Sequence, residues 1–276
     1  MKLISHRRRN VPWAGILLVV SMIPAALLAR LTVGSDNAKS NPSFPVVVEL
    51  FTSEGCSSCP PADALLARLS DESSSRNVEV IPLEEHVDYW NELGWYDPFS
   101  SREWTERQYA YAKPLGNGNP YTPQMVVDGT TEFVGSRAEL AVKSISEAAR
   151  RPKTEVTLSQ GAAGNPGAEA FSVTVRKLAD PSKNGNAEVW LAITESALHT
   201  AVKGGENVGH DLHHAAIVRS MKKIGEDKGS GDPSFSGTAI IPLRSEWKRE
   251  NLKAVVFVQE KKTLKIIGAA QISLHP

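Results

Sequence analysis

Two cysteines are the residues of this chain whose chemistry is easiest to name. Cys56 and Cys59 stand in the stretch FTSEGCSSCPPAD and are the only cysteines in the sequence. A disulfide between them closes a very short loop and restricts the unfolded chain little, so its use is chemical or metal-binding rather than structural. Thiol–disulfide exchange and the binding of a soft metal ion are both open at this point.

The residues around the pair favour a reactive thiol. A strand-like run, VVVELF, precedes the cysteines, and a helical pattern, ADALLARLS, follows them. Cys56 would then lie just before the first helical turn, where free backbone N–H groups and the positive end of the helix dipole lower the pKa of a thiol. Cys59 would be near enough to attack a mixed disulfide formed on Cys56. Pro60 and Pro61 suit a helix start, because no backbone donor is missed there.

The segments that would position the cysteines alternate between strand and helix from Pro45 to about Arg150. VEVIPL predicts a second strand and SSREWTERQYAYA a second helix, while MVVDG and TEFVG predict a hairpin and SRAELAVKSISEAARR an amphipathic helix. This order, strand, helix, strand, helix, hairpin, helix, is that of the thioredoxin core.

A different pattern begins after Pro152. Seven strand-like segments without a helical pattern follow, separated by clusters of Gly, Asn, Pro and Ser, and they favour an antiparallel sandwich. We therefore predict an α/β thioredoxin-like domain over residues 41–151, followed by an all-β sandwich-like domain over residues 152–276.

Three further residues gain a role from the resemblance to thioredoxin-like proteins. In that fold a cis-proline preceded by a small residue faces the cysteine pair, and Thr122-Pro123, directly before a predicted strand, looks like its equivalent. An acidic residue in the strand before the pair relays a proton to the second sulfur there, and Glu49 is similar in position. The alternatives are an ordinary proline at a strand entry and an outward-facing glutamate at a strand edge.

His86 follows the second predicted strand and belongs to a loop rich in aromatic residues. Loops after the carboxyl ends of parallel strands share one rim, so this loop should approach Cys56. The imidazole could transfer a proton or bind a metal ion, or it could simply form hydrogen bonds within the loop. Trp90 or Trp95 could border a cleft for a substrate, although core packing is the simpler interpretation of the aromatic residues.

Several motifs together resemble one family. ELFTSEGCSSCPPAD, HVDYW-x-x-LGW-x-DPFSS, RQ-x-x-YA, YTPQMVVDG and FVGS are similar to a bacterial secreted thioredoxin-like family of unknown function, and the resemblance extends from about Val46 to the C-terminus. It implies the thioredoxin-like fold and export, and no settled substrate. His210 stands where the family pattern has arginine, which weakens an anion-binding role for that position.

The segment from Gly204 to Arg219 concentrates polar side chains, including two neighbouring histidines. It could complete a site beside the cysteines if the second domain packed against the first. We favour a solvated hairpin instead, because the sequence alone does not bring this segment near Cys56.

The N-terminus has the layout of an export signal. MKLISHRRRN is basic, an apolar run of about twenty residues follows, and a polar stretch ends the segment. We assign residues 1–40 to an export signal and linker and expect a periplasmic or secreted protein. Membrane contact would come only through this segment, if it is not removed. Thirty-one basic and thirty-one acidic residues cancel, so no overall charge favours nucleic acid.

The function that these observations predict is thiol–disulfide exchange on a protein or small-molecule substrate, without a cofactor or a metal. Cys56 would attack, Cys59 would resolve the mixed disulfide, Glu49 would move the proton, and Thr122-Pro123 would align the substrate, with His86 nearby. One alternative is a copper(I)-binding chaperone that uses the cysteines and His86. Another is a partner-binding module without redox activity.

Overall fold

The computed structural model describes residues 43–73, 77–116, 118–164, 167–176, 187–227 and 231–274. The predicted export segment, residues 1–40, lies outside these ranges. Ser40–Pro276 form one compact unit. Within the described ranges, no helix has the length and apolar character that crossing a membrane requires.

The first part of the chain alternates strands and helices, in the order predicted. The elements are β1 (Val46–Thr52), α1 (Pro60–Asp71), β2 (Val80–His86), α2 (Arg102–Leu115), β3 (Gln124–Val127), β4 (Thr131–Val134) and α3 (Ala138–Ala149).

The second part is built almost wholly from strands. They are β5 (Val156–Ala162), β6 (Ala168–Val175), β7 (Ala187–Glu195), β8 (Leu198–Ala201), β9 (Asp211–His214), β10 (Ile217–Asp227), β11 (Phe235–Pro242), β12 (Leu252–Glu260) and β13 (Ile266–Ser273), with a short 3₁₀ helix, η2 (Arg249–Asn251), before β12.

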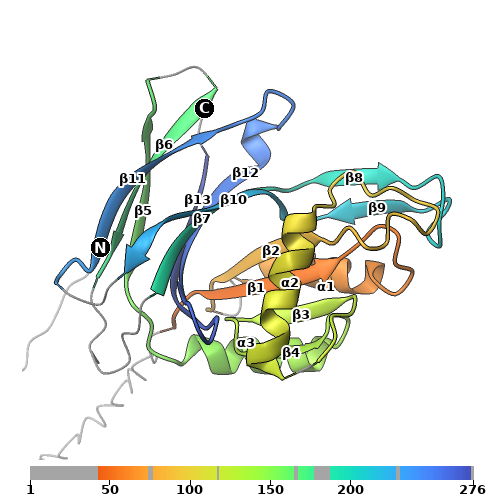
Figure 1. Ribbon diagram of the computed structural model, residues 1–276, viewed down its shortest axis with the longest axis horizontal. Helices are drawn as coiled ribbons and strands as arrows, with labels where there is room; N and C mark the ends of the chain where they lie inside the picture. The colour runs from red at the N-terminus through yellow and green to blue at the C-terminus, as the bar shows by residue number, and fades with distance from the viewer. Residues whose placement is uncertain are drawn as a thin grey trace, which may run out of the picture. The chain divides into compact units, whose positions relative to one another are not determined.

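One mixed sheet of eight strands runs through both parts, in the order β13-β12-β7-β10-β2-β1-β3-β4 (Figure 1). The join is a parallel pairing of β10 with β2, where Ile217 lies opposite Glu84 and the N–H of Glu84 donates to the carbonyl of Ala216 at 2.9 Å. A sheet of β1 to β4 alone would leave the backbone groups along β2 unpaired, and β10 covers that edge.

The predicted fold class is therefore wrong. The described chain is mostly β, with three short α-helices, and its large sheet is shared rather than divided between an α/β thioredoxin-like domain and a separate β sandwich. The remaining strands form a three-stranded sheet, β11-β6-β5, and a two-stranded hairpin of β8 and β9. The proposed boundary between residues 151 and 152 stays a prediction.

The helices cover both faces of the sheet because successive residues of β1 point to opposite sides. Val46, Val48 and Leu50 pack with side chains of α1 and α3. Val47 packs on the other face with Trp104 of α2. A further core lies between the three-stranded sheet and β7, β12 and β13.

A buried ion pair fastens the turn between β3 and β4. Asp128 accepts the N–H of Val47 at 3.0 Å with one carboxylate oxygen, and its other oxygen lies 2.6 Å from the ammonium of Lys153. Lys153 also donates to the carbonyl of Pro45. Burial raises the pKa of Asp128 and lowers the pKa of Lys153, against their mutual attraction. The pair stabilises the fold only while both members are present.

We expect Asp128→Asn to destabilise the protein by about 3 kcal/mol, because it leaves the buried Lys153 ammonium without a counter-charge. Asparagine tolerates the positive φ of 47° at this position, so backbone strain does not add to the effect. Urea unfolding of this variant, of Lys153→Met and of the double variant measures the coupling. If the double variant loses the sum of the two single losses, the pair is not coupled.

Candidate functional site

The two cysteines form a disulfide at the start of α1, with their Cα atoms 5.4 Å apart. Cys59 occupies the position that caps the helix, and Pro60 and Pro61 fill its first turn, as the sequence predicts. The N–H of Cys59 donates to the carbonyl of Cys56 at 3.1 Å, so the pair lies in one tight turn. Ser58 places its hydroxyl 3.4 Å from the sulfur of Cys56.

A loop from the far end of the sequence covers this turn. We call residues 202–210, which connect β8 to β9, the covering loop. The side-chain amide of Asn207 donates to the carbonyls of Glu54 and Cys56 at 2.8 and 3.0 Å, and the N–H of Ser57 donates to the carboxylate of Glu206 at 3.0 Å. Both cysteines are 0% exposed, whereas Ser57 between them is exposed. The segment is a hairpin with many exposed residues, as we favoured, but it also reaches the cysteine turn, which the sequence alone did not show.

Two glycines let the covering loop approach the loop after β2. A Cβ placed on Gly204 would lie 2.4 Å from the carbonyl oxygen of Gly94, so a larger residue does not fit. Gly205 has a φ of +69°, and a Cβ there would lie 3.0 Å from that of Trp95. The indole of Trp95 in turn donates to Glu54 at 2.8 Å. The covering loop, the loop after β2 that holds Trp95, and the cysteine turn thus pack against one another.

Thr122-Pro123 lies close to the cysteine turn, and the bond between the two residues is cis. The indole N–H of Trp90 donates to the hydroxyl of Thr122 at 2.9 Å, and a Cβ placed on Gly55 would meet the Cβ of Trp90 at 3.1 Å. Trp90 therefore bridges the turn that holds Cys56 and the residue before the proline.

Glu49 lies on the other face of the sheet. It precedes Thr52 by three residues in β1, and Thr52 points toward α1, where its hydroxyl donates to Asp63 at 2.7 Å. Glu49 instead accepts hydrogen bonds from Arg107 at 2.7 Å and Tyr111 at 2.9 Å, both on α2. Within the described ranges Glu49 forms no hydrogen bond or ion pair with a cysteine, so its relay role stays a prediction without structural support.

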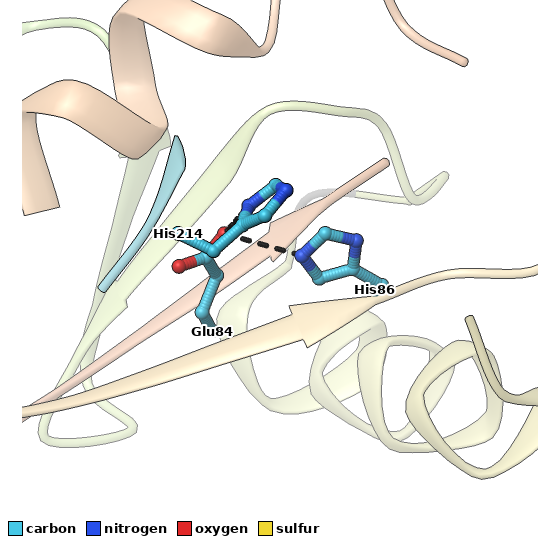
Figure 2. A group of neighbouring side chains, drawn as sticks. All are labelled: Glu84, His86 and His214. Carbon is cyan, nitrogen blue, oxygen red and sulfur yellow. Dashed lines mark hydrogen bonds and ion pairs between the residues drawn. The ribbon is translucent and has the colours of Figure 1, made fainter. Parts of the chain in front are cut away.

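A buried polar cluster, which sequence analysis largely missed, contacts Glu54, two residues before Cys56. Figure 2 shows its three central side chains. Glu84 and His86 come from β2, and His214 comes from the end of β9. One carboxylate oxygen of Glu84 lies 3.1 Å from Nε2 of His86 and 2.6 Å from Nδ1 of His214. The other oxygen accepts the N–H of Ala215 at 2.9 Å. The spacing of Glu84 and His86 puts both on one face of β2 and was the signal available in the sequence.

Two more carboxylates, those of Asp97 and Glu54, lie beside the imidazole nitrogens that face away from Glu84. Asp97 lies 2.7 Å from Nδ1 of His86 and accepts the N–H groups of Glu54 and Phe99 at 2.9 Å each. Glu54 lies 3.2 Å from Nε2 of His214. Each histidine therefore faces Glu84 with one ring nitrogen and a second carboxylate with the other.

The charges of this cluster compensate one another. Burial lowers the pKa of both histidines, but Asp97 and Glu84 raise the pKa of His86 well above its usual value, and Glu84 and Glu54 raise that of His214 to about 9. Burial works to raise the pKa of Glu84, yet the two histidines hold it far below its usual range. The cluster is thus stable only as a set of opposite charges in close contact.

Asp63 connects the cluster to the cysteine helix. It lies one turn after Cys59 on α1, and its backbone N–H donates to the carbonyl of Cys59 at 3.1 Å. Burial raises the pKa of Asp63 to about 7, Glu84 adds to the shift, and Thr52 opposes it. Asp63 also lines a cavity of about 640 Å³ between α1 and β9.

The chain belongs to a family described as a protein of unknown function (DUF1223), whose model matches residues 47–259. The predicted membership of a family without known function is confirmed, while its secreted character stays a prediction. Protein AGR_C_4864 from Agrobacterium tumefaciens is similar in structure, with 28% identity, a TM-score of 0.61, and coverage of 83% of this chain and 94% of that chain.

A second solved structure, HBP35 of Porphyromonas gingivalis, has a TM-score of 0.61 at 18% identity and covers 84% of this chain and 76% of its own, which shows likeness of fold alone. A domain of the outer membrane lipoprotein Omp28 from the same organism has 12% identity and covers 45% of this chain and 90% of its own. Its TM-score of 0.29 supports no inference. No curated protein matches the chain.

We expect Asn207→Ala to speed reduction of the Cys56–Cys59 disulfide by dithiothreitol about tenfold or more. The variant removes two hydrogen bonds that hold the covering loop shut, each worth about 1 kcal/mol. Quenched-flow alkylation of the released thiols measures the rate. His210→Ala, an exposed change in the same loop, is the matched control and should leave the rate unchanged. Equal rates for both variants would show that Asn207 does not limit access.

We expect Asp63→Asn to stabilise the protein at pH 8 by about 2 to 4 kcal/mol and to change its stability little at pH 4. Between the ordinary value of 3.8 and about 7, folded Asp63 keeps a proton that the unfolded chain has lost, so wild-type stability falls as the pH rises. The groups that face it are Thr52 on β1, Glu84 and His86 on β2, and His214 on β9.

Denaturant unfolding of metal-free protein across this pH range measures the effect. Asp71→Asn is the control, because Asp71 is an exposed carboxylate at the end of the same helix. A stability difference for Asp63→Asn that does not vary with pH would contradict the raised pKa.

Proposed function

We propose that this member of the DUF1223 family is an exported thiol–disulfide exchange protein whose reactive pair is Cys56 and Cys59. The observation that carries the proposal is the disulfide between them at the first turn of α1. The bridge closes so short a loop that it contributes little to folding, which leaves redox chemistry as its use.

The reaction runs in two exchange steps. In the reduced protein the thiolate of Cys56 attacks a substrate disulfide, a mixed disulfide forms, and one substrate thiolate leaves. Cys59 then loses its proton and attacks the sulfur of Cys56, which releases the second substrate thiolate and closes the Cys56–Cys59 disulfide. The substrate gains two electrons and the pair loses two. The reverse sequence oxidises a dithiol substrate.

Cys56 is the better candidate for the attacking group. The hydroxyl of Ser58, 3.4 Å from its sulfur, can donate to a thiolate there. Ser57 and Ser58 are exposed, so a substrate would approach from their side of the turn. The start of α1 further favours negative charge on the sulfur.

Asp63 is the candidate for the proton transfer that the second step needs. Its position one turn after Cys59, its burial and its raised pKa of about 7 suit a group that exchanges a proton near neutral pH. Thr122-Pro123 and Trp90 border the turn and are candidates for contact with a substrate backbone.

The covering loop makes access to the disulfide a separate step. Both cysteines are fully buried, so exchange requires residues 202–210 to move away from the turn. A substrate that displaced Asn207 from the carbonyl of Cys56 could open the site as it binds. Selection of the substrate by the loop follows from this arrangement.

The proposal of an exported protein draws on the basic and apolar pattern of residues 1–40 and on the disulfide, since such bonds persist in oxidising compartments. The copper(I) alternative gains no support among the described residues. His86 directs both ring nitrogens to Asp97 and Glu84, and within the described ranges it forms no hydrogen bond with a cysteine.

Trapping tests the proposal. Cys59→Ser leaves Cys56 able to form a mixed disulfide that is not resolved, so we expect covalent adducts with proteins of the cell envelope that dithiothreitol removes. Cys56→Ser is the matched control and should form far fewer adducts.

The same variants also define the outcome that would contradict the proposal. If the Cys59→Ser variant forms no adduct, and the wild-type disulfide resists millimolar dithiothreitol in both the native protein and Asn207→Ala, the pair is not redox-active. A partner-binding module without redox activity would then be the better description.

A further inference from the structure

Three buried side chains from two distant strands converge on one point (Figure 2). The ligand-type atoms of Glu84, His86 and His214 all lie within 4.8 Å of one another. Two imidazole nitrogens and a carboxylate oxygen form a donor set that binds divalent transition metals, with further positions left for water or another ligand.

The surroundings of the two histidines match those of metal-ligating imidazoles. A ligating histidine usually donates its other ring N–H to a carboxylate, which fixes the ring and raises its basicity. Asp97 lies 2.7 Å from the outer nitrogen of His86, and Glu54 lies 3.2 Å from the outer nitrogen of His214.

The two outer carboxylates are themselves held in place. Asp97 accepts two backbone N–H groups, and Glu54 accepts the indole N–H of Trp95 at 2.8 Å. The arrangement keeps both inner nitrogens directed at Glu84.

Charge balance is also satisfied by a divalent ion. Three carboxylates, Glu54, Glu84 and Asp97, lie against two imidazoles in a buried space. Protons on both rings contribute two positive charges to this cluster. One divalent cation between two neutral rings contributes the same two charges, so the net charge of the cluster does not change.

A cavity of about 640 Å³ lies between α1 and β9. It is lined by Asp63, Leu212 and His213, and His214 is the next residue of β9. None of the three proposed ligands lines this cavity, so the cluster itself stays buried.

We propose that Glu84, His86 and His214 bind a divalent transition-metal ion such as Zn²⁺, with Asp97 and Glu54 orienting the two imidazoles. The cysteines are not ligands, so this proposal does not depend on the redox function. Soft copper(I) is a poor match for the carboxylate in this donor set.

Calorimetric titration of the full chain with zinc chloride, after treatment with EDTA and with the disulfide intact, tests the proposal. We expect one ion per chain with a micromolar or lower Kd. His214→Gln and Glu84→Gln should weaken binding at least 100-fold, and Asp97→Asn about tenfold to 100-fold. The double variant Cys56→Ser, Cys59→Ser should keep the affinity of the wild type.

The matched control removes a second histidine pair. His199 and His213 stack at the surface beside Asp211 and could bind zinc adventitiously. The double variant His199→Ala, His213→Ala should keep tight binding at the buried cluster. Loss of binding in this variant, with retention in His214→Gln, would overturn the proposal.

A measurement on wild-type protein covers the case in which the cluster variants do not fold. Long-range proton–nitrogen NMR spectra of the histidine rings report which nitrogens take up the ion. We expect zinc to shift Nε2 of His86 and Nδ1 of His214 and to leave His199 and His213 unchanged. Shifts confined to the surface pair, or no shift at all, would overturn the assignment.

Discussion

The burial of Glu84 at the end of β2 determines much of this structure. A carboxylate with no exposed surface needs compensation, and Glu84 obtains it from His86 two residues later and from His214 at the end of β9. The N–H of Ala215 binds its second oxygen, and β10 begins two residues beyond. The residues that neutralise Glu84 thus also bring β10 against β2 and make the large sheet continuous.

The same interaction places the covering loop. Because His214 is held under the cysteine turn, the β8–β9 hairpin lies beside α1, and its connection extends over Cys56. Glu54 takes part in both contacts, since its carboxylate meets His214 and its carbonyl accepts Asn207. The cluster and the cover of the disulfide therefore share one residue, Glu54.

Sequence analysis found the local structure of the cysteine site and missed what completes it. The strand before the pair and the helix that begins with Pro60 follow from short patterns of residues. The role of Thr122-Pro123 came from the resemblance to thioredoxin-like proteins, and the structure links these residues to the cysteine turn only through Trp90. The parallel pairing of Ile217 with Glu84 joins strands far apart in the chain, and no pattern in either segment specifies that partner. His214 was noticed only as one of several polar residues, because its role depends on that pairing.

Alternation along β1 and β2 places Glu84 and Glu49 on opposite faces of the sheet. Glu84 and His86 point to the side of α1, and Glu85 points to the side of α2. There the guanidinium of Arg107 lies 2.7 Å from Glu49 and 3.4 Å from Glu85. The relay role of Glu49 rests on its similarity in position to the acidic residue of thioredoxin-like proteins, and in this structure Glu49 lies on the α2 face of the sheet.

The cluster around Arg107 and the cluster around Glu84 lie on opposite faces of the sheet. Their cationic side chains differ in chemistry. A guanidinium keeps its charge at any accessible pH, and Arg107 holds α2 on the sheet through Glu49 on β1 and Glu85 on β2. An imidazole nitrogen can hold either a proton or a metal ion. Under our proposal the cluster around Glu84 therefore has two states of equal charge, one with both rings protonated and one with a divalent ion between neutral rings. We therefore propose that the α1 face of the sheet, where the disulfide also lies, is the face that carries the chemistry.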